Sequence, residues 1–461
     1  MSGGNFEFIK EYNPKVYKKL NSAEKKARIN FRDSGKDIRD ALEGFVKTVI
    51  ERYDLSRTFP KNSDLNDKIK GLRDEEFLRK AGYLKKGERL EDKPILPNLG
   101  QVTYKLVKGV EEKGDYYDFI RRFGNACAHP EVKPENVKIS YANVIQSLKG
   151  FHTLFRNYYK ARLSNNMPQF DENLMPIGEY HVYHSYEPMD KLRSKCDREF
   201  LAYTLDSEGE KEFYAVIRLY NKSDLQTYFL QRNHKCFAEA SKLSISSVPE
   251  GMTKMRVLTP IDSQETTFYV VSYVFNREPF ELSDSILAGM TLKQRIKLCC
   301  RIANCMYNLH NLEVHIEHRM LNYESIFVCK FKDEWIPYVI KFDFAKIESQ
   351  TVKQTVLLNA VDAKERIKEN KIAKYLPPEW LNMQSPEKLN WAKVDIYSLG
   401  ILFSDILYGK ISEFPVSTER LEEFDLSEEI LDLLDCMRAD APDDRYDISF
   451  VKEMLDDELR N

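Results

Sequence analysis

The sequence predicts a multi-domain protein in which an all-α helical bundle is followed by an α+β part with two lobes. Two long apolar stripes at helical spacing lie in the first 163 residues, one from Ile38 and one from Ile145. A polar stretch with Pro168 and Gly178 then interrupts the helical pattern. Strand patterns around a single helix come next, and amphipathic helices complete the chain. We therefore divide the sequence into a helical domain (1–163), a linker (164–178), a small lobe (179–276) and a large lobe (277–461).

Composition and charge are typical of a globular protein. The 461 residues are 42% hydrophobic and 31% charged, which supports a buried core of ordinary size. The formal net charge of -3 gives no general attraction to nucleic acid or membrane, so any contact with RNA has to be local. No apolar run of about 18 residues is present to cross a bilayer, and the first residues have no signal-peptide pattern. We expect a cytoplasmic protein without membrane contact.

The eight cysteines do not indicate a metal site. They form no CxxC pair, and Cys299, Cys300 and Cys305 lie on a predicted buried helix. Small core thiols in a reducing compartment are the preferred interpretation. We therefore predict no bound metal, while a metal site remains the alternative.

The helical domain is predicted from the spacing of its apolar residues. Apolar positions recur at three and four residues from Ile38 to Tyr53, and again from Ile145 to Tyr159. The intervening residues 56–99 are charged and rich in turn formers, which favours short helices and loops. We expect a further helix near Gln101 to Glu112.

Chemistry-bearing residues gather between Asp115 and Pro130, where Arg122, Asn125 and His129 occur. An imidazole that titrates near neutral pH can move the proton of a ribose 2'-hydroxyl, and a guanidinium can stabilise the charge of a phosphorane. The stretch resembles the motif of HEPN domains, a helical-bundle family whose signature is an Arg, four to six residues and a His, often as Gly-Asn-x-x-x-His.

The HEPN resemblance implies a metal-independent endoribonuclease with Arg122, His129 and Asn125 as catalytic residues. It also implies a homodimer through this domain, with RNA bound by a local site for which Arg121, Arg122 and Lys133 are the nearest cations. No cofactor is required for this chemistry.

A structural role is the alternative for the same residues. Arg122 and His129 are seven apart and are expected on one face of a helix, and relatives of this fold use the site for packing or dimerisation. Asn125 either orients the site or caps the helix near Pro130. Gly124 stands where a tighter form of the motif has a second Arg.

The stretch from His318 to Lys346 organises the second part of the chain. It resembles the catalytic loop and metal-binding turn of protein kinases, H-R-D-L-x-x-x-N followed by D-F-G. Met320 stands at the position of the catalytic Asp and Ser325 at that of the Asn, which leaves Asp343 as the one strong metal ligand. Because Met cannot accept a proton, the loop lacks its base. It still has residues, such as His318, that match the structural positions of the kinase loop.

Further landmarks follow in the order that kinases have. An apolar helix from about Leu292 ends at His310, although two extra residues separate His310 from His318 compared with the usual loop. Residues 375–379 resemble the A-P-E end of an activation segment, and residues 395–400 resemble a buried Asp-x-Tyr-Ser-x-Gly helix start. By the same resemblance, Arg445 is expected to form a buried ion pair with Glu379.

The small lobe is expected to bind nucleotide weakly or not at all. Arg218 stands in the position of the ATP-binding Lys, and Glu239, on a helix predicted for 224–243, is its expected partner. Residues 192–205, where a glycine-rich loop would cover phosphates, contain no glycine. A strand predicted for 266–274 leads to Ser272, Tyr273 and Val274, whose backbone would face an adenine. This arrangement leaves weak ATP binding as the most that is expected.

Three functions from different classes follow from these predictions. In the first, the helical domain is a ribonuclease, and the kinase-like domain is its sensor or dimerisation platform, responding to a regulatory protein or a nucleotide. In the second, the kinase-like domain transfers phosphate by an unusual route through Asp343 and Arg218. In the third, both domains are inert and form a scaffold. Phosphate transfer is the least expected of the three functions, because the base, the Asn, the Lys and the glycines on which it depends are all absent.

Overall fold

A computed structural model describes the chain at residues 4–104, 106, 111–129, 139–160, 163, 169–172, 175–186, 198–222, 224–242, 251–259, 268–312, 315–347, 372–382 and 389–460. The chain divides into two compact units. Unit 1 comprises Met1–Ser185, Phe200–Thr204 and Leu258–Val270, and unit 2 comprises Tyr186–Glu199, Leu205–Val257 and Val271–Asn461.

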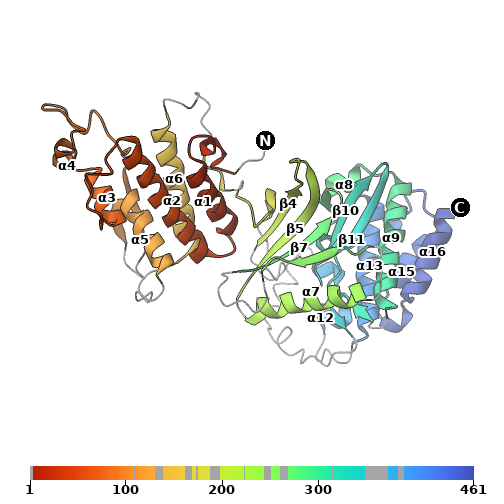
Figure 1. Cartoon of the computed structure of the whole chain (residues 1–461). Coiled ribbons are helices and arrows are strands. Elements are labelled where there is room, and N and C mark those ends of the chain that lie inside the picture. Colours follow the sequence, from red (N-terminus) through yellow and green to blue (C-terminus); the bar gives the residue numbers. More distant parts are fainter. Residues whose placement is uncertain are drawn as a thin grey trace. The chain divides into compact units, whose positions relative to one another are not determined.

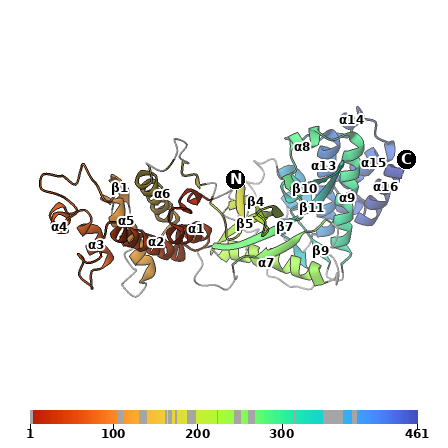
Figure 2. The same cartoon turned by 45° about the horizontal axis from the view of Figure 1, so that its top comes forward.

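The N-terminal part of the chain is mainly helical, as predicted. Its elements are a 3-10 turn η1 (Glu7–Ile9), α1 (Pro14–Lys26), α2 (Phe31–Arg52), α3 (Leu65–Gly71), α4 (Glu75–Lys80), β1 (Gln101–Tyr104), β2 (Glu112–Asp115), α5 (Tyr116–Ala128) and α6 (Tyr141–Tyr158). Helices α1, α2, α5 and α6 lie side by side in both views (Figures 1 and 2), with α2 in contact with the other three. The apolar stripes of α2 and α6 face a shared core that includes Phe45 and Phe155.

The expected helix at 101–112 is wrong, because β1 occupies Gln101–Tyr104 and β2 begins at Glu112. Strands β1 and β2 pair antiparallel, with Gln101 opposite Asp115 and Tyr104 opposite Glu112. Burial alternates along β1, where Val102 and Tyr104 face the core. That period of two, with a β-branched residue and an aromatic at the buried positions, is the pattern of a half-buried strand. The N-terminal part is therefore not entirely α-helical.

The later part of the chain combines sheets and helices, as predicted. A five-stranded sheet has the order β3-β4-β5-β7-β6, and smaller sheets have the orders β11-β10-β8 and β12-β9. The strands are β3 (His181–Tyr186), β4 (Arg198–Leu205), β5 (Lys211–Asn221), β6 (Lys254–Val257), β7 (Phe268–Phe275), β8 (Pro279–Glu281), β9 (Ile316–Glu317), β10 (Ile326–Phe331), β11 (Glu334–Val339) and β12 (Lys346–Ile347).

The helices of unit 2 include the two that the sequence predicts at 224–243 and from Leu292 to His310. They are α7 (Asp224–Lys242), α8 (Asp284–Ala288), α9 (Leu292–His310), α12 (Pro378–Leu381), α13 (Trp391–Tyr408), α14 (Thr418–Leu421), α15 (Glu428–Met437) and α16 (Ile448–Arg460), with 3-10 turns η4 (Tyr323–Ser325), η5 (Ala373–Tyr375) and η7 (Pro442–Asp444). Helix α13 contacts α9 and α15, and α9 also contacts α16 and β11 (Figure 1). Because α13 is apolar on nearly all sides, it forms the centre of this helical group.

No helix in the described ranges is both long and apolar enough to cross a membrane.

One histidine, which the sequence does not single out, lies in the core of unit 1. The His152 side chain is only 2% exposed and is surrounded by the rings of Phe6, Phe8 and Phe170 at centroid distances of 5.3–6.1 Å. Its Nε2 has no hydrogen-bond partner. Burial among these rings lowers the pKa of His152 to about 4.

Unit 1 is therefore expected to lose stability in mild acid. Below pH 6.5 the unfolded chain protonates His152, whereas the folded unit resists protonation until about pH 4. The free energy of unfolding of unit 1 should therefore fall by up to about 3 kcal/mol as the pH decreases from 6.5 to about 4. In thermal unfolding followed by circular dichroism, His152→Phe should flatten the decline between pH 7 and pH 4. An unchanged pH dependence in this variant would contradict the assignment.

Candidate functional site

The residues expected to act on RNA lie on and just after α5. Asp115 caps the start of the helix, since its side chain accepts a hydrogen bond from the backbone of Asp118. The helix ends at Ala128, and His129 has the non-helical angles φ -121° and ψ 76°. Because a residue before proline is disfavoured in the α region, Pro130 accounts for this end. The His129 side chain is exposed.

His129 is the residue that ends α5, and its amide still makes a helical hydrogen bond to the backbone oxygen of Asn125. His129 belongs to the turn that ends α5, so a spacing of seven does not fix its direction. A His129 buried against its own core would have favoured a purely structural role. Its exposure leaves the imidazole accessible to a ligand.

Arg122 is held by the β1–β2 hairpin. Its guanidinium forms an ion pair with Glu112 through both terminal nitrogens, one of them at 3.2 Å, and Nη1 also donates to the Tyr104 hydroxyl at 3.0 Å. The bonds to Glu112 raise the pKa of Arg122. Its neighbour Arg121 is paired with Asp118 at 2.6 Å. Arg121 and Arg122, two of the cations that the sequence predicts for RNA, are thus each paired with a carboxylate, and the third, Lys133, lies outside the described residues.

Asn125 has a partner that is distant in the sequence and could not be predicted from it. Its Oδ1 accepts a hydrogen bond of 2.7 Å from Nε of Arg39, a residue of α2 that is 86 positions away in sequence. Arg39 is also 3.8 Å from Glu43, which is more than half exposed. Asn125 thus orients a guanidinium through its side chain, while its backbone oxygen accepts from the amide of His129.

Two glycines bring α2 and α5 close enough for this contact. A Cβ atom at Gly124 would lie 2.6 Å from the Cβ of Arg39 and 3.1 Å from its Cα. A Cβ atom at Gly35 would lie 2.2 Å from the Sγ of Cys127. A larger residue before Asn125 would push the helices apart, which explains why the tighter form of the motif is absent here.

A buried cluster of charges surrounds Arg218 in unit 2. The Arg218 side chain is 0% exposed, and its Nη1 lies 2.9 and 3.1 Å from the two carboxylate oxygens of Asp343. Its Nε lies 3.3 Å from Glu199, and Nη1 also donates to the Tyr220 hydroxyl. The residue in the expected ATP-binding position therefore binds the one residue expected to hold a metal.

Further polar contacts fix Asp343 in this position. Asn233 of α7 donates to its Oδ1 at 2.7 Å, and Tyr273 of β7 donates to the amide oxygen of Asn233 at 2.9 Å. Asn233 and Tyr273 are fully buried. Asn233 could not be predicted from the sequence, because a helical stripe does not show which distant carboxylate a buried amide will contact.

Lys341 lies beside the same cluster. Its Nζ is 3.0 Å from Glu199, and its φ of 66° is in the left-handed region that few side chains adopt. Burial opposes its charge, but Glu199, Glu281 and Glu324 outweigh it and raise the pKa of Lys341. Burial also raises the pKa of Glu281 to about 7.

The loop from His318 contains residues fixed by structural contacts. Asp395 of α13 accepts hydrogen bonds from the backbone amides of His318 and Arg319 at 2.8 and 2.7 Å, and from His310 at 3.1 Å. His318 Nε2 lies 3.1 Å from the carbonyl oxygen of Ile340. The helices and the loop that the sequence analysis aligned are thus connected through one buried carboxylate.

Met320 and Ser325 serve packing and turn formation. Met320 packs against a small apolar cluster that includes Trp380 and Trp391. Ser325 is buried, and its hydroxyl accepts from the Asn322 amide and donates to the Asn322 carbonyl oxygen. Neither side chain offers a base for a substrate hydroxyl.

The remaining nucleotide-site expectations have mixed outcomes. Glu239 belongs to α7, but its side chain lies outside the described residues, as do positions 192–197 of the glycine-free stretch. Residues 272–274 lie within β7, an interior strand of the sheet, where Val274 is opposite Lys254. The Val274 carbonyl oxygen already accepts the Thr253 hydroxyl. These backbone groups are used within the sheet.

The predicted ion pair between Arg445 and Glu379 is confirmed. Nη1 and Nη2 of Arg445 donate to the two carboxylate oxygens at 2.6 and 2.9 Å, and the Arg445 side chain is completely buried. Backbone carbonyls of Ala439, Lys393 and Asp440 accept its other hydrogen bonds. The pair joins the first turn of α12 to the turn before α16.

Within the described ranges, no group of three or more His, Cys, Asp or Glu side chains is arranged to hold a metal ion.

Comparisons of the sequence with known proteins identify no relative. No protein-family model matches the chain, and no curated protein matches it.

Proposed function

We propose that unit 1 is a HEPN-like domain that cleaves RNA without a metal, and that unit 2 is a kinase-like domain that does not transfer phosphate. The exposed His129 carries the first part of the proposal. It follows directly after a helix whose last turns contain Asn125 and, bound to it, the Arg39 guanidinium. An accessible imidazole near an oriented cation is the minimum set for acid–base cleavage of a phosphodiester.

Arg39 is the better candidate than Arg122 for the phosphate contact. Arg122 has its charge balanced by a two-point pair with Glu112, whereas the charged neighbour of Arg39 is the largely exposed Glu43 at 3.8 Å. A solvated pair of this kind is weak and can be exchanged for a phosphate at little cost. Asn125 then acts as a positioning residue for Arg39.

In the proposed reaction, one imidazole removes the proton of a ribose 2'-hydroxyl. The 2'-oxygen bonds to phosphorus, the bond from phosphorus to the 5'-oxygen breaks, and a second acid protonates that oxygen. The products are a 2',3'-cyclic phosphate and a free 5'-hydroxyl. Because one chain supplies one His129, a homodimer through unit 1 would provide the two acid–base groups.

The buried cluster of unit 2 supports the second part of the proposal. Asp343, the expected metal ligand, is bound by Arg218 and Asn233, and Met320 packs into an apolar cluster. Phosphoryl transfer depends on positioned metal ions and a base, and these side chains are committed elsewhere. Unit 2 is then a sensor or a platform for unit 1, which responds to a regulatory protein or to weakly bound nucleotide.

Cleavage of a labelled single-stranded RNA in excess EDTA tests the ribonuclease. The full-length protein should produce 2',3'-cyclic phosphate ends, and His129→Ala should reduce the rate by about 100-fold or more, as loss of an acid–base group does. His234→Ala, which changes another exposed histidine, is the matched control and should retain the rate. Arg39→Gln should slow cleavage more than Arg121→Gln.

A scaffold is the second candidate, and the Arg122–Glu112 pair favours it. In that case Arg122 stabilises the hairpin against α5 and has no contact with RNA. Equal residual cleavage by wild type and His129→Ala, or a unit 1 that stays monomeric at micromolar concentration, would favour the scaffold over the ribonuclease.

A further inference from the structure

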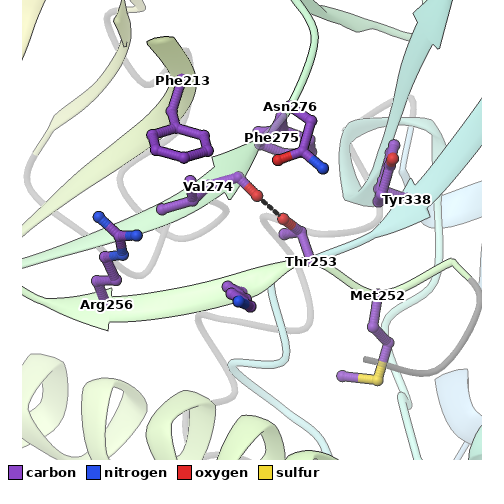
Figure 3. Close-up of a pocket in the computed structure, with 9 residues that line it drawn as sticks. Phe213, Met252, Thr253, Arg256, Val274, Phe275, Asn276 and Tyr338 are labelled. Atoms are coloured by element: carbon purple, nitrogen blue, oxygen red, sulfur yellow. Dashed lines mark hydrogen bonds between the residues drawn. The ribbon is translucent and has the colours of Figure 1, made fainter. Parts of the chain in front are cut away.

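A pocket of about 280 Å³ lies in unit 2, away from the Arg218 cluster in its lining residues (Figure 3). Strands β5, β6, β7 and β11 contribute to its wall, together with the residues just before β6 and just after β7. The volume is close to the lower end of the range of small-molecule sites, roughly 300–1,000 Å³. A ligand of one or two rings matches this size.

The inner wall of the pocket is apolar and buried. Met252, Val274 and Phe275 are all less than 10% exposed. Phe275 contacts the Tyr338 ring edge-to-face at a centroid distance of 5.1 Å. The Thr253 hydroxyl donates to the Val274 carbonyl oxygen, which is the dashed bond in Figure 3, so the wall has no strong free acceptor at this position.

The outer part of the pocket is cationic. Lys254 and Arg256 line it from alternate positions of β6 and are both exposed, and none of the lining residues is acidic. The Arg256 guanidinium lies 5.6 Å from the centre of the Phe213 ring. Among the described residues, no carboxylate forms an ion pair with either cation. The side-chain amide of Asn276 and the Tyr338 hydroxyl also have no hydrogen-bond partner there.

We propose that this pocket binds a small aromatic anion. The ring of the ligand packs against Phe213 and the apolar wall, and its anionic group is bound by Lys254 and Arg256. A guanidinium already stacked on an aromatic ring is suited to this arrangement, because it can bind an anion while it keeps its ring contact. Asn276 and Tyr338 provide a donor–acceptor pair and a hydroxyl for polar groups on the ring.

The ligand class is an aromatic ring with one carboxylate or phosphate. An uncharged ring of the same size would lose the attraction of two cations, and a free inorganic anion would leave the apolar wall without a partner. Because the two cations are exposed, affinity should fall as the salt concentration rises. All residues that line the pocket belong to unit 2, so a test of ligand binding here is independent of the test of RNA cleavage by His129.

Binding to the full-length protein can be measured by ligand-observed NMR and by thermal shift. One arm uses a nucleoside 5'-monophosphate, a second uses an aromatic carboxylate such as benzoate, and a third uses inorganic phosphate with uncharged nucleoside. We expect saturable binding in the first or second arm and none in the third. Which of the first two binds identifies the source of the anion.

Two substitutions then locate the site. Lys254→Gln and Arg256→Gln should each weaken binding at least fivefold, and together at least 20-fold, without a change in the melting temperature of the free protein. Lys410→Gln changes an exposed lysine outside the pocket lining and should leave binding unchanged. No saturable binding of either aromatic anion at millimolar concentration, or binding that both pocket variants retain, would overturn the proposal.

Discussion

Asp343→Ala is expected to reduce the free energy of unfolding of unit 2 by about 3–5 kcal/mol, the usual effect of breaking one partner of a buried pair. The substitution leaves the completely buried Arg218 guanidinium with one carboxylate fewer and removes the acceptor of Asn233. A catalytic Asp in an open site would give a different result, since its loss abolishes activity with little cost to stability.

Urea unfolding followed by tryptophan fluorescence measures this effect, because all three tryptophans, Trp335, Trp380 and Trp391, belong to unit 2. Asp425→Ala removes an exposed carboxylate in the same unit and should change stability by less than about 0.5 kcal/mol.

Phosphate transfer from ATP with Mg²⁺ should be absent in the wild type. Sustained transfer that disappears in Asp343→Ala would contradict an inactive kinase-like unit.

Arg445→Ala should destabilise unit 2 by a similar amount, about 3–5 kcal/mol. The substitution leaves the Glu379 carboxylate without its two-point partner, and it leaves the carbonyl oxygens of Ala439 and Lys393 without donors. Arg445→Lys should recover little, because an ammonium cannot reproduce the planar fork that contacts both carboxylate oxygens.

Arg460→Ala is the matched control for this experiment. Its pair with Asp457 is on the surface, with the arginine side chain 75% exposed, so the expected change is below about 1 kcal/mol. The same tryptophan signal reports both variants. Equal unfolding curves for Arg445→Ala and the wild type would mean that the ion pair contributes nothing to the stability of the folded unit.

These two ion pairs have different consequences for function. The pair between Arg445 and Glu379 joins two segments of unit 2 and involves no residue expected to meet a ligand. The pair between Arg218 and Asp343 joins the two residues to which the kinase resemblance assigns a nucleotide and a metal. In the folded unit the Asp343 carboxylate is occupied by Arg218 and Asn233.

Local features of the chain were predictable because they depend on neighbours in sequence. The helices α2, α6, α7 and α9 follow from apolar residues spaced three and four positions apart, because this spacing places the residues on one face of a helix. The loss of a base at Met320 follows from side-chain chemistry alone. The prediction of a helix at 101–112 was wrong because buried and exposed residues alternate in β1. This period of two indicates a strand.

The sequence by itself determined the long helices, the change from helices to strands in the later part of the chain, and which chemical groups are close to one another along the chain. Only the tertiary structure decided the partners of the charged groups. Arg39 meets Asn125 across 86 residues because two glycines let α2 and α5 approach, and Arg218 meets Asp343 across 125 residues. The physical reason is that side-chain periodicity is set by the backbone of one element, whereas the pairing of buried charges depends on how separate elements pack.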